Sequence, residues 1–90
     1  MLYAFCVKPA TVAYSAGAEL VFAGEYEAAI EKLSEAIRLD PRYAPAYTSR
    51  GSAYLYTGES QAAIQDYDTA IRLASENPDL ADDYYNRGFV

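Results

Sequence analysis

The sequence of 90 residues contains no histidine, and Cys6 is its single cysteine. Histidine is the side chain that proteins use most often as a general base and as a metal ligand, so its absence disfavours most hydrolytic and metal-dependent chemistry. One cysteine permits neither an internal disulfide nor a zinc site built from several thiolates. The sequence therefore predicts a protein that is not an enzyme and has no cofactor and no metal site.

Basic residues are also scarce. Seven lysines and arginines oppose thirteen acids, which gives a net charge of −6. Nucleic-acid phosphates and anionic membrane surfaces both attract lysine and arginine, so we expect neither of them as a partner. The close acidic pairs Asp66/Asp68 and Asp82/Asp83 are more typical of a solvated surface than of a metal site, because neighbouring residues on a helix do not face each other.

Long hydrophobic runs are missing as well. No stretch approaches the roughly 18 apolar residues of a membrane span, and the apolar segment Met1–Val7 lacks the basic leader of a signal peptide. We therefore expect a soluble, cytoplasmic protein. Because hydrophobic residues still make up 52 % of the chain, a packed core is expected in one small domain.

An internal repeat is the dominant feature of the sequence. The stretch that begins at Gly24 recurs 34 residues later from Gly58, with half of its positions identical. A fixed period of this length is typical of repeat architectures. We predict an apolar arm over residues 1–9 and a repeat domain over 10–90. Within that domain we expect one repeat over 10–43, a second over 44–80, and the first helix of a third over 81–90.

Apolar residues within each repeat recur at helical spacing, which predicts an all-α fold. Glycine, or a residue followed by proline, stands where each helix should end. The expected helices cover 10–23, 25–39, 44–57, 60–74 and 79–89, with residues 75–78 as a loop. The buried face of the second is expected to hold Ala29, Ile30, Leu33, Ala36 and Ile37, and that of the fourth Ala63, Ile64, Tyr67, Ala70 and Ile71.

Glycines also occur inside the expected helices, at Gly17, Gly51 and Gly88. Glycine within a helix costs about 1 kcal/mol relative to alanine, so it is favoured there only for another reason. We expect these positions to allow close approach of a neighbouring helix. Large side chains are expected to fill the spaces beside them: Tyr47, Tyr54 and Tyr67, or Leu20 and Leu33.

The second repeat carries Tyr47, Arg50-Gly51, Tyr54, Ala63 and Tyr67, and the first carries Ala13, Ala16-Gly17, Leu20, Ala29, Leu33 and Pro41. This pattern resembles the tetratricopeptide repeat family. The resemblance implies antiparallel helix pairs stacked as a solenoid into a right-handed superhelix. It also implies a concave groove, lined by the first helix of each pair, that binds peptides.

The resemblance further implies which residues line the groove and which partner is excluded. One subtype of the family holds the C-terminal carboxylate of heat-shock chaperones with cations, but the matching positions here carry none: Tyr14, Ala18, Ser49, Asp82 and Asn86. We therefore expect no acidic peptide tail in the groove. The groove-lining residues would be Tyr14, Ala18, Phe22, Tyr43, Thr48, Ser52, Leu55, Tyr56, Tyr85 and Phe89.

The ten tyrosines of the chain are the other unusual feature. Tyr14, Tyr56 and Tyr85 are not needed by the core pattern, and tyrosine is enriched at interfaces. Two functions remain open at this point. The first is an interaction scaffold that holds a protein or peptide in an apolar, tyrosine-rich groove. The alternative is a structural protein that forms a homodimer through its exposed end helix, with contacts from Leu80, Tyr85, Phe89 and Val90.

Overall fold

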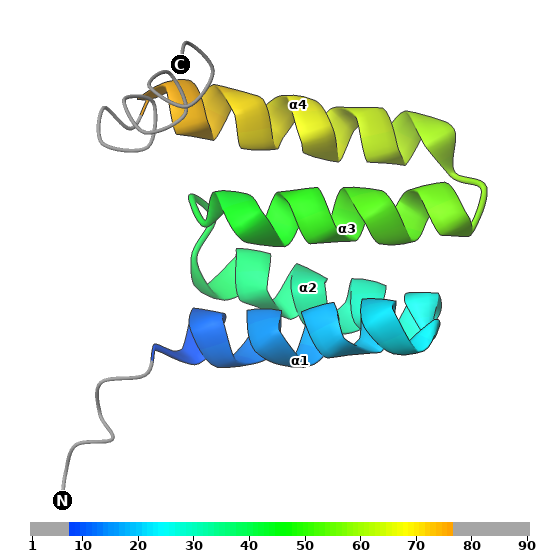
Figure 1. Cartoon of the computed structure of the whole chain (residues 1–90). Helices are drawn as coiled ribbons and strands as arrows, with labels where there is room; N and C mark the ends of the chain where they lie inside the picture. The colour runs from blue at the N-terminus through cyan, green and yellow to red at the C-terminus, as the bar shows by residue number, and fades with distance from the viewer. Residues whose placement is uncertain (1–7, 77–90) are drawn as a thin grey trace, which may run out of the picture.

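The computed structural model describes residues 8–76, which form four helices connected by short turns. They are α1 (Pro9–Ala23), α2 (Tyr26–Leu39), α3 (Ala44–Tyr56) and α4 (Ser60–Glu76). Figure 1 shows them running antiparallel, with α3 and α4 stacked in sequence on the α1–α2 pair. The helical repeat fold predicted from the sequence is thus confirmed. The predicted helix 79–89 and the segment Met1–Val7 lie outside the described residues.

The same turn joins the two helices of each pair. After α1, Gly24 takes a φ of 84°, and Glu25 N–H donates to the Leu20 carbonyl at 2.9 Å. After α3, Gly58 takes a φ of 86°, and Glu59 N–H donates to the Tyr54 carbonyl at 2.8 Å. This left-handed conformation is strained for residues with a Cβ, so glycine is required at both positions.

A different turn joins α2 to α3. Asp40 ends α2, since the following Pro41 disfavours helical backbone at the residue before it. The Asp40 carboxylate accepts a hydrogen bond from Arg42 N–H at 3.2 Å, and the Tyr47 hydroxyl donates to the Pro41 carbonyl at 2.8 Å. These bonds fix the direction in which α3 leaves α2.

The core is built mainly from alanines and one leucine. Ala29, Leu33, Ala36, Ala46, Ala53 and Ala63 are fully buried. Small residues let the helix axes approach, and larger, half-buried side chains pack around them. Gly17 and Gly51 show the closest approaches. A Cβ at Gly17 would lie 2.6 Å from Leu33 Cγ, and one at Gly51 would lie 3.1 Å from the Tyr67 ring. The predicted role of both glycines is confirmed.

Two details of the predicted helices were wrong. Ser75 was expected in a loop, but α4 continues to Glu76. Ile64 and Ile71 were expected on a buried face, yet they are 58 % and 65 % exposed among the described residues. Their counterparts Ile30 and Ile37 are half-buried, because α3 packs beside α2.

Candidate functional site

The predicted groove residues that the structure describes come from α1, α3 and the turn before α3. Three of them expose large apolar surface: Phe22 is 95 % exposed, Leu55 51 % and Tyr56 67 %. Thr48 of α3 is exposed as well. Burial of a large apolar side chain contributes roughly 1.5–3 kcal/mol, so these side chains offer binding energy that the fold itself leaves unused.

The other predicted groove residues are partly used by the fold. Tyr14 packs against two clusters of buried residues, Ala13/Ala36/Ala46 and Ala29/Leu33/Ala53. Its ring meets that of Tyr43 edge-on, with centroids 5.3 Å apart. The Ser52 hydroxyl lies 2.9 Å from the Tyr67 hydroxyl, which ties α3 to α4. Ala18 is also half-buried. Tyr14, Tyr43 and Ser52 are therefore held in place by contacts within the fold, and we call these three residues the fixed floor.

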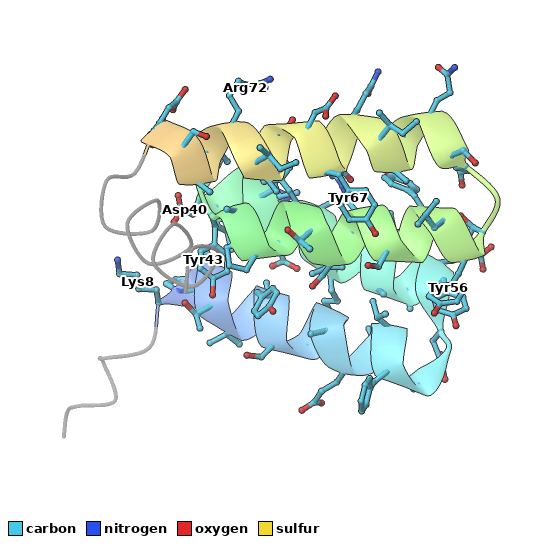
Figure 2. The ribbon with its side chains drawn as sticks, turned by 45° about the horizontal axis from the view of Figure 1, so that its top comes forward. Lys8, Asp40, Tyr43, Tyr56, Tyr67 and Arg72 are labelled. Atoms are coloured by element: carbon cyan, nitrogen blue, oxygen red, sulfur yellow. The ribbon has the colours of Figure 1, made fainter. Side chains whose placement is uncertain are left out.

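A hollow lies at the end of the molecule where α1 and α3 finish. We call it the end hollow. It has a volume of about 470 Å³. Tyr56 lies there (Figure 2). Its ring is stacked on that of Tyr26 at a centroid distance of 4.6 Å and an interplanar angle of 9°. The residues that line it are Gly24, Glu25, Tyr26, Glu27, Ala28, Tyr56 and Thr57.

A polar network within the second helix pair was not foreseen from the sequence. Arg50 donates two hydrogen bonds to Asp66, at 2.8 and 2.9 Å, and a third to Ser34 of α2 at 2.9 Å. Its guanidinium also lies 5.9 Å from the Tyr47 ring centroid and 5.7 Å from that of Tyr54. The hydrogen bonds that Arg50 donates to Asp66 raise the pKa of Arg50 above its ordinary value, against the opposing effect of burial.

This network is structural, because the Arg50 guanidinium is hydrogen-bonded to Asp66 and Ser34 within the fold. Asp66 is 5 % exposed, and no buried side-chain nitrogen or oxygen among the described residues is left without a hydrogen bond. The signal was present in the sequence, since Arg50 occupies a position where the repeat pattern has leucine. An arginine at an otherwise apolar position predicts an acidic partner on the facing helix.

The remaining predicted site residues lie outside residues 8–76. They are Leu80, Tyr85, Phe89 and Val90, so the predicted groove and dimer contacts there stay predictions. Within the described range, no three acidic or sulfur-bearing side chains come together as a metal site. In the same range no helix has both the length and the apolar composition to cross a bilayer.

The stacked antiparallel helix pairs define a helical-repeat protein. Two models of one family match the chain: a TPR repeat model over residues 17–58 and a tetratricopeptide repeat model over residues 44–77. The chain therefore belongs to the tetratricopeptide repeat family. A comparison with curated proteins found no match. Repeats of this family generally mediate protein–protein interaction and typically act as non-catalytic scaffolds.

Proposed function

We propose that this protein is a non-catalytic scaffold that holds a peptide or protein segment against the face formed by α1 and α3. The observation that carries this proposal is the exposure of Phe22, Leu55 and Tyr56 on these two helices. The fold leaves these large side chains in solvent, while the fixed floor of Tyr14, Tyr43 and Ser52 lies on the same two helices and the turn between the pairs.

Preorganisation supports the same proposal. Binding is weakened by the entropy lost when side chains are ordered, so a surface whose floor is already fixed binds more tightly for the same contact area. The Tyr14–Tyr43 contact and the Ser52–Tyr67 hydrogen bond hold that floor in place before any partner arrives.

The test begins with selection of octapeptides from a random phage-displayed library on the immobilised full chain. The strongest peptide is then labelled, and its affinity is measured by fluorescence anisotropy for wild type, Leu55→Asp and Ile64→Asp. The two positions have similar exposure, 51 % and 58 %, but lie on α3 and α4 respectively. We expect Leu55→Asp to weaken binding at least tenfold and Ile64→Asp to leave it within twofold.

The opposite result, loss of binding with Ile64→Asp and none with Leu55→Asp, would place the partner on α4 and reject the proposed face. Failure of the library to yield any peptide would reject the scaffold proposal itself. Thermal unfolding of both variants serves as a control, because each substitution replaces a half-exposed apolar residue and is expected to change stability by less than about 1 kcal/mol.

Self-association is a second candidate, and one observation favours it. Ile64 and Ile71 lie one above the other on α4, two turns apart, and both are more than half exposed. On α2, the equivalent residues Ile30 and Ile37 are covered by α3. A second copy that covers the α4 face would complete the same packing. The two functions are compatible, because they use different helices.

A further inference from the structure

The end hollow combines an open aromatic ring with carboxylates. One face of the Tyr56 ring is stacked on Tyr26, and the side chain is still 67 % exposed. Glu25 and Glu27 line the same hollow, and both are exposed. An aromatic face carries negative electrostatic potential, so it attracts a cation that approaches from above the ring. The carboxylates favour the same charge on a ligand.

The charge around the hollow extends this preference over the whole end of the molecule. We call this part the acidic end: residues 19–31, which include the α1–α2 turn, and residues 52–65, which include the α3–α4 turn (Figure 1, right-hand side). It contains no lysine or arginine. Its charged residues are Glu19, Glu25, Glu27, Glu31 and Glu59, all of them exposed.

The described cations all lie in the other half of the molecule. There the charges nearly balance, because Lys8, Lys32, Arg38, Arg42, Arg50 and Arg72 occur together with Glu35, Asp40, Asp66, Asp68 and Glu76. The charge of the described residues is therefore distributed very unevenly along the helices: the acidic end carries five acids and no cation, whereas six cations face five acids in the other half. Such a field steers positively charged ligands toward that end.

Exposed carboxylates alone would be an ordinary solvated surface. What distinguishes this end is the hollow, which is lined by the exposed side chain of Tyr56. Arginine fits both features, because its planar guanidinium stacks on aromatic rings and pairs with carboxylates at the same time. The protein itself contains an example of this chemistry, since Arg50 lies near two tyrosine rings while it is hydrogen-bonded to Asp66.

We propose that the end hollow binds a basic side chain of the partner, arginine in preference to lysine, stacked on Tyr56 and paired with Glu25 or Glu27. This inference rests on the proposed function and adds the chemistry of the partner. Tyr56 belongs both to the predicted groove and to the lining of the hollow. A partner segment on α1 and α3 would therefore place its apolar residues near Leu55 and its basic residue at the end of α3.

The same library selection tests this inference. Peptides enriched on the wild-type chain are expected to contain arginine next to apolar residues. The probe is the strongest such peptide, compared with a copy in which citrulline replaces arginine. Citrulline keeps the shape of arginine but carries no charge, so we expect the replacement to weaken binding by about tenfold, as for a paired and stacked cation.

Protein variants then locate the contact. Tyr56→Leu keeps an apolar side chain but removes the aromatic face, and we expect it to weaken binding of the arginine peptide by about fivefold. Glu25→Gln and Glu27→Gln, made one at a time, should each weaken binding by a few-fold, most clearly at low salt. Asp68→Asn changes the net charge equally but lies on α4 outside the acidic end, and it should leave affinity unchanged.

Three results would overturn the inference while the scaffold proposal stands: enrichment of peptides without arginine or lysine, equal binding of the citrulline peptide, or an equal effect of Asp68→Asn and Glu27→Gln. Wild-type affinity in Tyr56→Leu would also overturn it. If no peptide is enriched at all, the scaffold proposal fails and the inference fails with it, so the two failures are distinguishable.

Discussion

Gly17 and Gly51 occupy matching places in the two helix pairs, but their surroundings differ. The nearest atoms to a Cβ at Gly17 are the branched end of Leu33, at 2.6 and 2.7 Å. At Gly51 they belong to the Tyr67 ring, at 3.1 and 3.2 Å. Leu33 is fully buried, whereas Tyr67 is half-buried. The first contact is therefore the less tolerant of the two.

We predict that Gly17→Ala destabilises the fold by about 1–3 kcal/mol, because overpacking against Leu33 outweighs the gain of about 1 kcal/mol in helix propensity. Gly51→Ala should cost less. Urea unfolding of both variants measures the difference. A further variant, Gly17→Ala with Leu33→Ala, should be less destabilised than the sum of its single substitutions, since the added methyl group fills part of the space that Leu33 leaves. Strict additivity would contradict the proposed contact.

The Arg50–Asp66 pair gives a second prediction at this scale. The Arg50 and Asp66 side chains are 20 % and 7 % exposed. Removing one partner of such a pair leaves a charge with little solvent, so Asp66→Ala should destabilise the fold by about 2–4 kcal/mol. The double variant Arg50→Leu with Asp66→Ala should recover most of this loss, because both charges are then absent. A double variant as unstable as Asp66→Ala alone would show that the pairing is not the cause.

Each helix of the described structure has an apolar face, but the faces of α2 and α4 have different surroundings. Ile30 and Ile37 on α2 pack against the clusters that α3 completes. Ile64 and Ile71 repeat their spacing on α4 and are exposed. A stripe of this kind is a typical site for association, because its burial adds roughly 1.5–3 kcal/mol per side chain.

From this face we predict concentration-dependent self-association. Sedimentation of the wild-type chain over a range of concentrations should show a monomer–dimer equilibrium, and the variant Ile64→Glu with Ile71→Glu should remain a monomer at every concentration. The matched control is Val12→Glu, since Val12 is also exposed, at 54 %, but lies on α1. If wild type and variants sediment alike as monomers, the homodimer alternative is rejected.

At the level of elements, the sequence predicts the fold closely because the fold is repetitive. Agreement between the period, the glycine turns and the apolar spacing fixed four helices to within one or two residues. The exposure of Ile64 could not be predicted in this way, since a repeat pattern assumes a neighbour on both sides. The repeat boundaries at 43 and 80, the arm 1–9, the helix 79–89 and a cytoplasmic location stay predictions.

The candidate site was less predictable. The resemblance to the family placed Phe22, Leu55 and Tyr56 on the groove, and their exposure is consistent with that placement. It could not predict the stacking of Tyr26 on Tyr56, because these residues are 30 positions apart and neither belongs to the repeat pattern. Contacts between different repeats depend on the angle at which the pairs stack, which no single helix determines.

At the scale of the whole molecule, the described residues carry their negative excess at one end, and this gives a prediction about partners. A peptide that ends in several acidic residues meets no cation at Tyr14, Ala18 or Ser49, where one subtype of the family would provide them. We expect no detectable binding of such a peptide at micromolar protein concentrations, by fluorescence anisotropy at low salt. Micromolar affinity that falls as salt is added would contradict this prediction and the basic-partner inference together.

The four helices that the structure describes do not all touch one another. Among the four described helices, α3 contacts α1, α2 and α4, whereas α4 contacts neither α1 nor α2. Helix α4 can therefore detach while α1, α2 and α3 keep their mutual contacts. Backbone amides of α4 should exchange with solvent deuterium earlier than those of α3, and a partner that bridges α1 and α3 should slow the exchange of the centre of the molecule most.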